Sequence, residues 1–93
     1  ARNALGQNAP NPFNPSTVIR YSVAQTGPVT LRIFNAGGAL VRTLVDTQHA
    51  PGDYSVRWDG HDDSGRRLSS GVYFYKIETA AGFRDSKKLI LLK

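Results

Sequence analysis

The chain has 93 residues, the length of one domain, and its twelve Lys and Arg against seven Asp and Glu give a formal net charge of +5. It contains no cysteine, which excludes disulfides, thiolate metal sites and cysteine nucleophiles. No run approaches the roughly eighteen apolar residues of a transmembrane helix, so no membrane-spanning segment is expected.

Residues 1–10 show no sustained hydrophobic pattern, and we interpret them as a linker from an upstream domain of the same chain, in which Ala4 and Leu5 could touch the folded domain. Further along, short runs alternate apolar and polar residues, the period-two pattern of strands with one buried face. Residues 40–45 fit either a strand or one to two helical turns. The remaining runs predict strands over 17–23, 29–33, 54–58, 72–78 and 83–92.

Two of the predicted strands carry apolar residues on both faces. In the strand over 72–78, Val72 and Phe74 predict a central strand covered on both sides, and the run 89–92 predicts the same. The core is expected to form around Trp58, together with Tyr21, Leu31, Ile33, Tyr54 and Val56.

Turn-forming residues separate these runs at short intervals, and Asn35-Ala36-Gly37-Gly38 predicts a tight hairpin turn. No segment carries a ten-residue helical stripe. The fold class is therefore all-β, and we predict an immunoglobulin-like antiparallel β-sandwich of about seven strands with no disulfide. The Cys…Trp…Cys pattern of antibody domains is absent.

Catalytic motifs are missing. His49 and His61, the two histidines, both fall in predicted turns, and neither a Gly-x-Ser-x-Gly elbow nor a His-Glu-x-x-His helix is present. We interpret both residues as exposed loop histidines. The protein is not expected to be an enzyme, and no cofactor is expected.

The stretch from Asp59 to Gly65 is the most metal-like part of the chain, because hard cations prefer clustered oxygen ligands. An EF-hand is excluded, since His61 and Ser64 stand at its third and sixth positions. Two interpretations remain: a looser calcium site built from Asp59, Asp62 and Asp63, or a turn whose Asp side chains accept hydrogen bonds from local backbone amides.

Basic residues suggest two further surfaces. Arg20, Arg32 and Arg57 occupy outward positions of different strands and could together form a basic face for an anionic partner. Nucleic-acid binding is not expected, because most aromatic residues fall at core positions. The apolar run 89–92 is surrounded by Arg84, Lys87, Lys88 and Lys93, which indicates either a readable terminus or a strand with solubilising flanks.

Several of these motifs together resemble a known family. The opening Asn11-Pro12-Phe13-Asn14-Pro15, the central Gly52-x-Tyr54-x-Val56-x-Trp58-Asp59-Gly60 and the later Gly71-Val72-Tyr73 are similar to those of the type A C-terminal sorting domain of the bacterial type IX secretion system. The resemblance covers residues 11–93, and Ser70 departs from the proline that is common before the Gly-x-Tyr motif.

The resemblance implies a targeting domain that directs an upstream cargo protein through the periplasm and across the outer membrane. Its partners would be the type IX translocon and a sorting peptidase, and the cargo would be left on the cell surface or released into the medium. The family's recognition motifs fall on Gly71, Val72, Tyr73, Gly82, Lys87, Lys88 and Lys93 of this chain.

Two alternatives come from other functional classes. The immunoglobulin-like domain of the flagellar hook-capping protein is related and shares Trp58-Asp59-Gly60 and the Gly-x-Tyr strand, which would indicate a structural assembly module. A carbohydrate-binding accessory module would need exposed aromatic rings, for which Phe34 and either Tyr73 or Tyr75 are the candidates.

Overall fold

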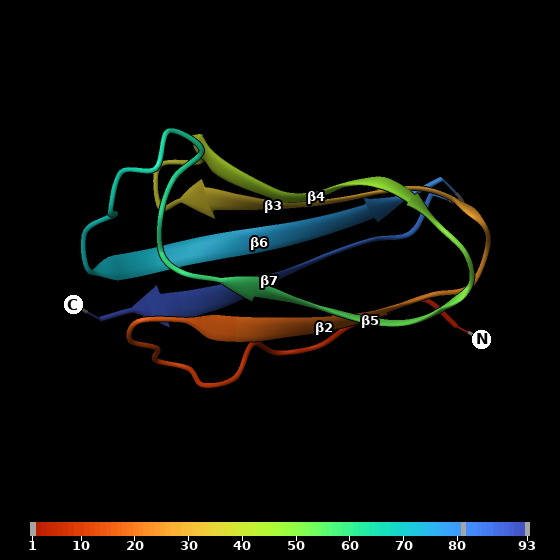
Figure 1. Cartoon of the computed structure of the whole chain (residues 1–93), viewed down its shortest axis with the longest axis horizontal. Helices are drawn as coiled ribbons and strands as arrows, with labels where there is room; N and C mark the ends of the chain where they lie inside the picture. The colour runs from red at the N-terminus through yellow and green to blue at the C-terminus, as the bar shows by residue number, and fades with distance from the viewer. Residues whose placement is uncertain (1, 81, 93) are drawn as a thin grey trace.

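The computed structural model describes residues 2–80 and 82–92, and these residues form a two-layered β-sandwich (Figure 1). Every pair of neighbouring strands is antiparallel. The three-stranded sheet has the order β1-β2-β5, with β1 at Ala4–Leu5, β2 at Thr17–Val23 and β5 at Gly52–Trp58. The four-stranded sheet has the order β4-β3-β6-β7, with β4 at Leu40–His49, β3 at Gly27–Asn35, β6 at Gly71–Thr79 and β7 at Arg84–Leu91. Within the described ranges, no helix is suited to crossing a membrane.

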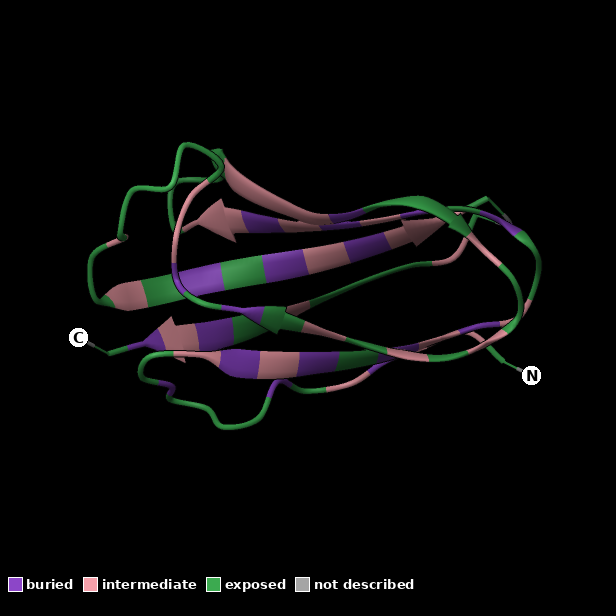
Figure 2. Ribbon diagram, viewed as in Figure 1, coloured by how far each residue is buried: buried purple, intermediate pink, exposed green. Residues whose placement is uncertain are grey.

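Alternation along the strands builds the core, as the predicted pattern required. Figure 2 shows buried and exposed positions alternating along β6. Ile19, Leu31, Ile33 and Trp58 are completely buried between the sheets. Each aliphatic side chain removed from water in this way contributes about 1.5–3 kcal/mol to the free energy of folding. Tyr21 is also buried, while Tyr54 and Val56 pack partly buried against this cluster, so the predicted core is confirmed.

The region that the sequence left between strand and helix is the ten-residue strand β4. It pairs with β3 through the predicted hairpin turn, in which Asn35 Oδ1 accepts a hydrogen bond from the Ala39 amide at 2.9 Å. Gly38 adopts a positive φ of 88° there, which favours glycine. The pairing shifts register between Leu31 and Arg32 and between Ile33 and Phe34, and such bulges disturb period-two alternation.

The expectation that 72–78 and 89–92 are covered on both faces was wrong. β6 is central within its sheet, but Val72 and Phe74 are 39% and 40% exposed. β7 is a terminal strand of the same sheet, and Leu89 and Leu91 are buried while Leu92 is 49% exposed. The reason is architectural: a sandwich has only two layers, so each sheet keeps one outer face.

The segment interpreted as a linker contains a strand. In β1, Ala4 pairs with Ser22 and Leu5 with Tyr21 of β2, and Leu5 is buried in the core. The contact of Ala4 and Leu5 with the domain was expected, but their strand pairing was not, because a strand of two residues is too short to show alternation. Its connection to an upstream domain remains a prediction.

Candidate functional site

The opening motif of the sequence lies beside the last strand. The Phe13 amide donates to the Ile90 carbonyl at 3.0 Å, and the Leu92 amide donates to the Phe13 carbonyl at 3.0 Å. Asn11 Oδ1 accepts from the Ile90 amide, and Gln7 Nε2 donates to the Lys88 carbonyl, both at 2.9 Å. Residues 7–13, which we call the strap, therefore occupy hydrogen-bonding groups of β7 that face away from β6.

A polar network with buried members joins the strap to Tyr75 of β6 and Thr17 of β2. Tyr75 Oη accepts a hydrogen bond from the Asn8 amide at 2.9 Å and donates to the Gly6 carbonyl at 2.6 Å. Asn8 Nδ2 donates to Thr17 Oγ1 at 3.1 Å, and Thr17 donates to the Pro10 carbonyl at 2.9 Å. Burial raises the pKa of Tyr75 above its usual value, so the phenol stays protonated and can donate.

An aromatic cluster joins the strap to the two other motifs of the family resemblance. The ring of Trp58, which is completely buried, has its centroid 5.5 Å from that of Phe13 and 5.7 Å from that of Tyr73. Trp58 Nε1 donates to the His61 carbonyl at 3.0 Å, and Tyr73 Oη donates to the Ser69 carbonyl at 2.8 Å. Both polar tips of these buried rings are thereby satisfied.

Within the opening motif, two residues contact the rest of the domain, and the other three are exposed. Phe13 is 1% exposed and belongs to the core, and Asn11 caps an amide of β7. Pro12, Asn14 and Pro15 are exposed. The contacts of the motif therefore come from Asn11 and Phe13.

The predicted recognition residues at the start of β6 meet the end of β7. Gly71 pairs with Leu91, Val72 with Ile90 and Tyr73 with Leu89. Tyr73 is buried, whereas Val72 is exposed. The Val72 side chain is therefore available to a partner, while Tyr73 serves packing.

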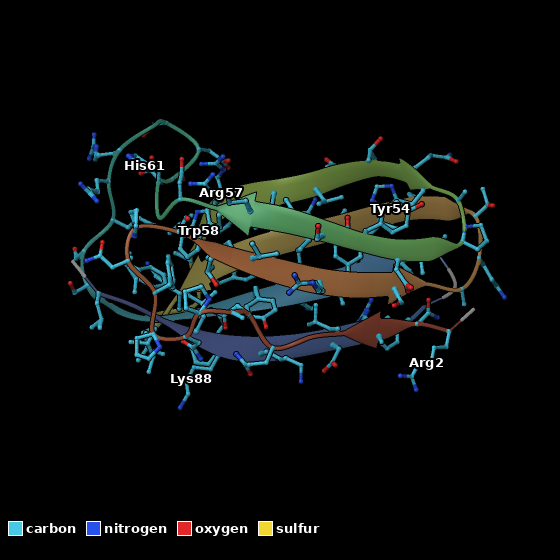
Figure 3. All side chains as sticks on the ribbon, turned by 60° about the horizontal axis from the view of Figure 1, so that its bottom comes forward. Arg2, Tyr54, Arg57, Trp58, His61 and Lys88 are labelled. Carbon is cyan, nitrogen blue, oxygen red and sulfur yellow. The ribbon has the colours of Figure 1, made fainter. Side chains whose placement is uncertain are left out.

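The basic recognition residues lie further along the same hairpin. Lys88 is exposed on the outer face opposite Phe74 and extends away from the ribbon in Figure 3, whereas Lys87 is partly buried opposite Tyr75. Gly82 lies in the turn between β6 and β7, at the far end of the hairpin, and its φ is 84°. Lys93 lies outside the described residues. The structure therefore does not bring Gly82 together with the other recognition residues.

The carboxylates of the three candidate calcium ligands each accept hydrogen bonds from backbone amides, those of Asp59 and Asp62 within their own loop and that of Asp63 from β4. Asp62 Oδ1 accepts hydrogen bonds from the Ser64 hydroxyl at 2.7 Å, the Arg66 amide at 2.9 Å and the Ser64 amide at 3.0 Å. These bonds, first of all the one from the Ser64 side chain, lower the pKa of Asp62. Asp63 Oδ1 accepts from the Thr43 amide at 3.1 Å, which ties the loop to β4.

The Asp59 carboxylate also accepts a hydrogen bond from a backbone amide of its own loop. Its Oδ1 accepts from the His61 amide at 3.1 Å and lies 3.7 Å from Arg42 Nη1. Partial burial acts to raise the pKa of Asp59, but the hydrogen bonds and charge of His61, with the charge of Arg42, lower it overall. No group of three or more His, Asp or Glu suited to a metal ion occurs within residues 2–80 and 82–92. The local hydrogen bonds match the Asx-turn interpretation.

His49 is not a free loop histidine, which corrects one expectation. It is the last residue of β4, its ring stacks on Tyr54 at a centroid distance of 4.0 Å, and its Nε2 lies 2.8 Å from Tyr21 Oη. The sequence placed it in a turn because the apolar pattern of β4 ends before it.

The basic face suggested for three arginines does not exist. Arg20 and Arg57 lie on the outer face of the three-stranded sheet, while Arg32 lies on the outer face of the four-stranded sheet, on the opposite side of the sandwich. Tyr73 and Tyr75 are both buried, so neither offers an exposed ring to a glycan.

Comparison with known proteins supports the fold. The profile of the family described as "FlgD Ig-like domain" matches residues 15–82. A search of curated proteins finds no significant match.

Solved structures resemble the chain along most of its length. PorU from Porphyromonas gingivalis, in its dimeric latent form, superimposes with a TM-score of 0.76 at 20% identity, covering 99% of this chain and 10% of PorU. FlgD from Xanthomonas campestris, described in the context of hook capping in flagellar assembly, gives 0.65 at 27% identity over 95% of this chain and 65% of FlgD. PorZ, described as a surface component of the type IX secretion system of P. gingivalis, gives 0.58 at 19% identity over 98% of this chain and 11% of PorZ. The chain thus spans about a tenth of PorU and of PorZ.

Proposed function

The chain belongs to the FlgD Ig-like domain family, and from the sorting-domain motifs of its sequence we propose that it is a C-terminal sorting domain that directs an upstream cargo protein across the bacterial outer membrane by type IX secretion. In this role the domain is an address without catalytic activity. Its partners are the translocon and a sorting peptidase, and its destination is the outer surface or the medium.

One observation carries the proposal. The opening motif of the family resemblance is hydrogen-bonded to the final strand, which carries the recognition residues Lys87 and Lys88, through Asn11, Phe13 and Ile90. The start of β6, with the third motif, pairs with the same strand. Motifs that are scattered over the sequence thus form one folded unit, as a recognition element requires.

The likeness in fold to PorZ, a type IX component, supports the same proposal. An address also needs groups that a receptor can reach, and the hairpin β6–β7 offers Val72 and Lys88 on its exposed side. Of the three motif residues that open β6, Val72 is the one whose side chain a receptor can contact directly.

A structural assembly module is the second candidate. The family match itself and the 27% identity to a hook-capping FlgD favour this role. It predicts self-association or binding to a filament partner instead of export.

The deciding experiment is a reporter export assay. A fluorescent protein with an ordinary signal peptide is fused to residues 1–93 and expressed in a bacterium with a working type IX system and in a strain without the translocon. Delivery to the surface or medium that depends on the translocon is expected. Retention of a folded fusion in the periplasm of both strains would refute the sorting role and favour the assembly module.

The variants in this assay must keep the fold. Removing the last ten residues would delete Leu89 and Leu91 from the core and so would confound signal with stability. Removing only residues 92–93 leaves both leucines in place. Arg57→Ala, on the outer face of the other sheet, is the matched control and is expected to be exported normally.

A further inference from the structure

The outer face of the four-stranded sheet is unusually apolar at one end. Among the described residues, the exposed large hydrophobic side chains are Leu40, Val72, Phe74 and Leu92. Three of them belong to β4 and β6 of this sheet, and Leu92 directly follows β7. Their exposed fractions lie between 39% and 50%, and Figure 2 shows the exposed positions that interrupt the buried ones along β6.

The strand register joins Leu40, Val72 and Phe74 to two further apolar residues in a continuous row. Phe34 of β3 pairs with Leu40 of β4 on one side and with Phe74 of β6 on the other. Val72 and Ile90, paired with each other, lie next to Phe74 along β6 and β7. We call these five residues the apolar row.

Positive charge borders the apolar row. Arg32 lies two residues from Phe34 along β3, Lys76 lies two residues from Phe74 along β6, and the two cationic residues pair directly with each other. Lys88 of β7 pairs with Phe74. Like charges directly opposite in a sheet destabilise it, so this pair is not explained by folding. No carboxylate of the described residues lies within ion-pair distance of Arg32, and Lys76 Nζ is 3.9 Å from Glu78, which lies nearer to Arg84.

The other outer face of the molecule is an internal control. On the three-stranded sheet the outward pairs are Ser22–Asp53, Arg20–Ser55 and Val18–Arg57, and Ser22 Oγ donates to Asp53 at 2.7 Å. None of the exposed large hydrophobic residues lies there. The apolar row is therefore a property of one face and not of the surface in general.

From this contrast we infer that the outer face of the four-stranded sheet, centred on Phe34 and Phe74, is the surface by which the domain docks onto an acidic protein surface with an apolar centre. This inference rests on the proposed function and identifies the partner as a component of the export machinery. Exposed apolar patches mark interaction sites, and aromatic residues and Arg, such as Phe34, Phe74 and Arg32 here, are enriched at protein interfaces. A second copy would bring the same positive charges, Arg32, Lys76 and Lys88, to the interface from both sides, which opposes dimerisation through this face.

The first test uses variants of the reporter fusion. Phe74→Ser and Arg32→Glu are each expected to reduce export about tenfold or more, as for the loss of a central interface residue. Arg32→Glu also places opposite charges across β3 and β6, so its melting temperature should be unchanged or higher. Reduced export by a domain at least as stable as the parent chain cannot be attributed to unfolding.

The matched controls are Val18→Ser and Arg20→Glu on the three-stranded sheet, which should leave export within about twofold of the parent chain, the change expected of residues outside an interface. If the parent chain is exported and both Phe74→Ser and Arg32→Glu are exported equally well, the docking surface is refuted while the sorting role stands. If the parent chain itself is retained in the periplasm, the sorting role is refuted, and this inference falls with it.

A second test identifies the occupant. A photo-crosslinking residue, p-benzoylphenylalanine, is placed at position 74 of the fusion and irradiated in exporting cells. An adduct with a translocon protein at an acidic surface is expected. An adduct with lipid, or with a second copy of this chain, would overturn the assignment and give the face to a membrane or to a dimer.

Discussion

Asn11 Oδ1 accepts a hydrogen bond from the backbone amide of Ile90 at 2.9 Å, although 79 positions separate the two residues in the chain. Together with the two backbone bonds of Phe13, it closes part of the exposed edge of β7. Open strand edges invite pairing with other chains, so the strap also protects the domain from association along this edge.

Replacing Asn11 by Ala should uncap β7. We expect Asn11→Ala to lower the free energy of unfolding by about 0.5–1.5 kcal/mol and to speed hydrogen exchange at the Ile90 amide. Amide exchange followed by NMR measures both the effect and its location. Asn14→Ala is the control, because Asn14 is exposed and makes no hydrogen bond among the described residues. Equal exchange at Ile90 in both variants would contradict the cap.

Trp58 should be the most costly core residue to truncate. Its side chain is completely buried between Phe13 and Tyr73, so Trp58→Ala should destabilise the domain by about 3–5 kcal/mol. Thermal melting followed by circular dichroism measures the change. A melting temperature equal to that of the parent would be incompatible with this core.

The Tyr75 hydroxyl should hold the strap in place. Tyr75→Phe keeps the ring but leaves the Asn8 amide and the Gly6 carbonyl without their partner, which should cost about 1–3 kcal/mol. Denaturant unfolding measures the loss, and limited proteolysis should then cut within residues 7–13 first. Tyr54→Phe removes a hydroxyl bound to the Ala50 carbonyl outside the strap, and so should not increase cleavage there.

A pair of glycine variants separates backbone strain from packing. Gly60 and Gly65 have similar positive φ values of 79° and 85°, so replacement by Ala strains either position by about 1–2 kcal/mol. A Cβ at Gly60 would lie 3.4 Å from Leu91 Cδ1, whereas at Gly65 it would meet nothing within 4 Å. Gly60→Ala should therefore lose at least as much stability as Gly65→Ala by chemical denaturation. Equal losses would show that contact with Leu91 is harmless, and a smaller loss for Gly60→Ala would show that the added contact stabilises the domain.

The loop from Asp59 to Gly65 should respond to acid. Because the pKa of folded Asp62 is lowered below its usual value of 3.8, its carboxylate stabilises the native state above that pH, and the stabilisation is lost as the pH falls through the lowered pKa. Asp62→Asn should therefore be less stable than the parent at pH 7, and the difference should shrink at pH values below the usual pKa. Parallel melts across this range provide the measurement, and a difference independent of pH would argue against the charged carboxylate.

Much of the architecture follows from local patterns. Alternation along β2, β3, β5 and β6 predicts their buried faces, because side chains of a strand point alternately to opposite sides whatever the partner. The turn at Asn35–Gly38 follows from residue types alone, since positive φ at Gly38 carries no steric cost for glycine. These features depend on neighbours in the sequence, and so the sequence by itself determined them.

Tertiary structure alone decided which segments meet. The pairing of the strap with β7 joins residues about eighty positions apart, and no local pattern encodes such a contact. The exposure of Phe74 was likewise beyond the pattern, since an apolar residue on the second face of a strand predicts a covering layer that this two-layered fold lacks. Burial depends on which layers stack on a sheet, and layer number is a property of the whole chain.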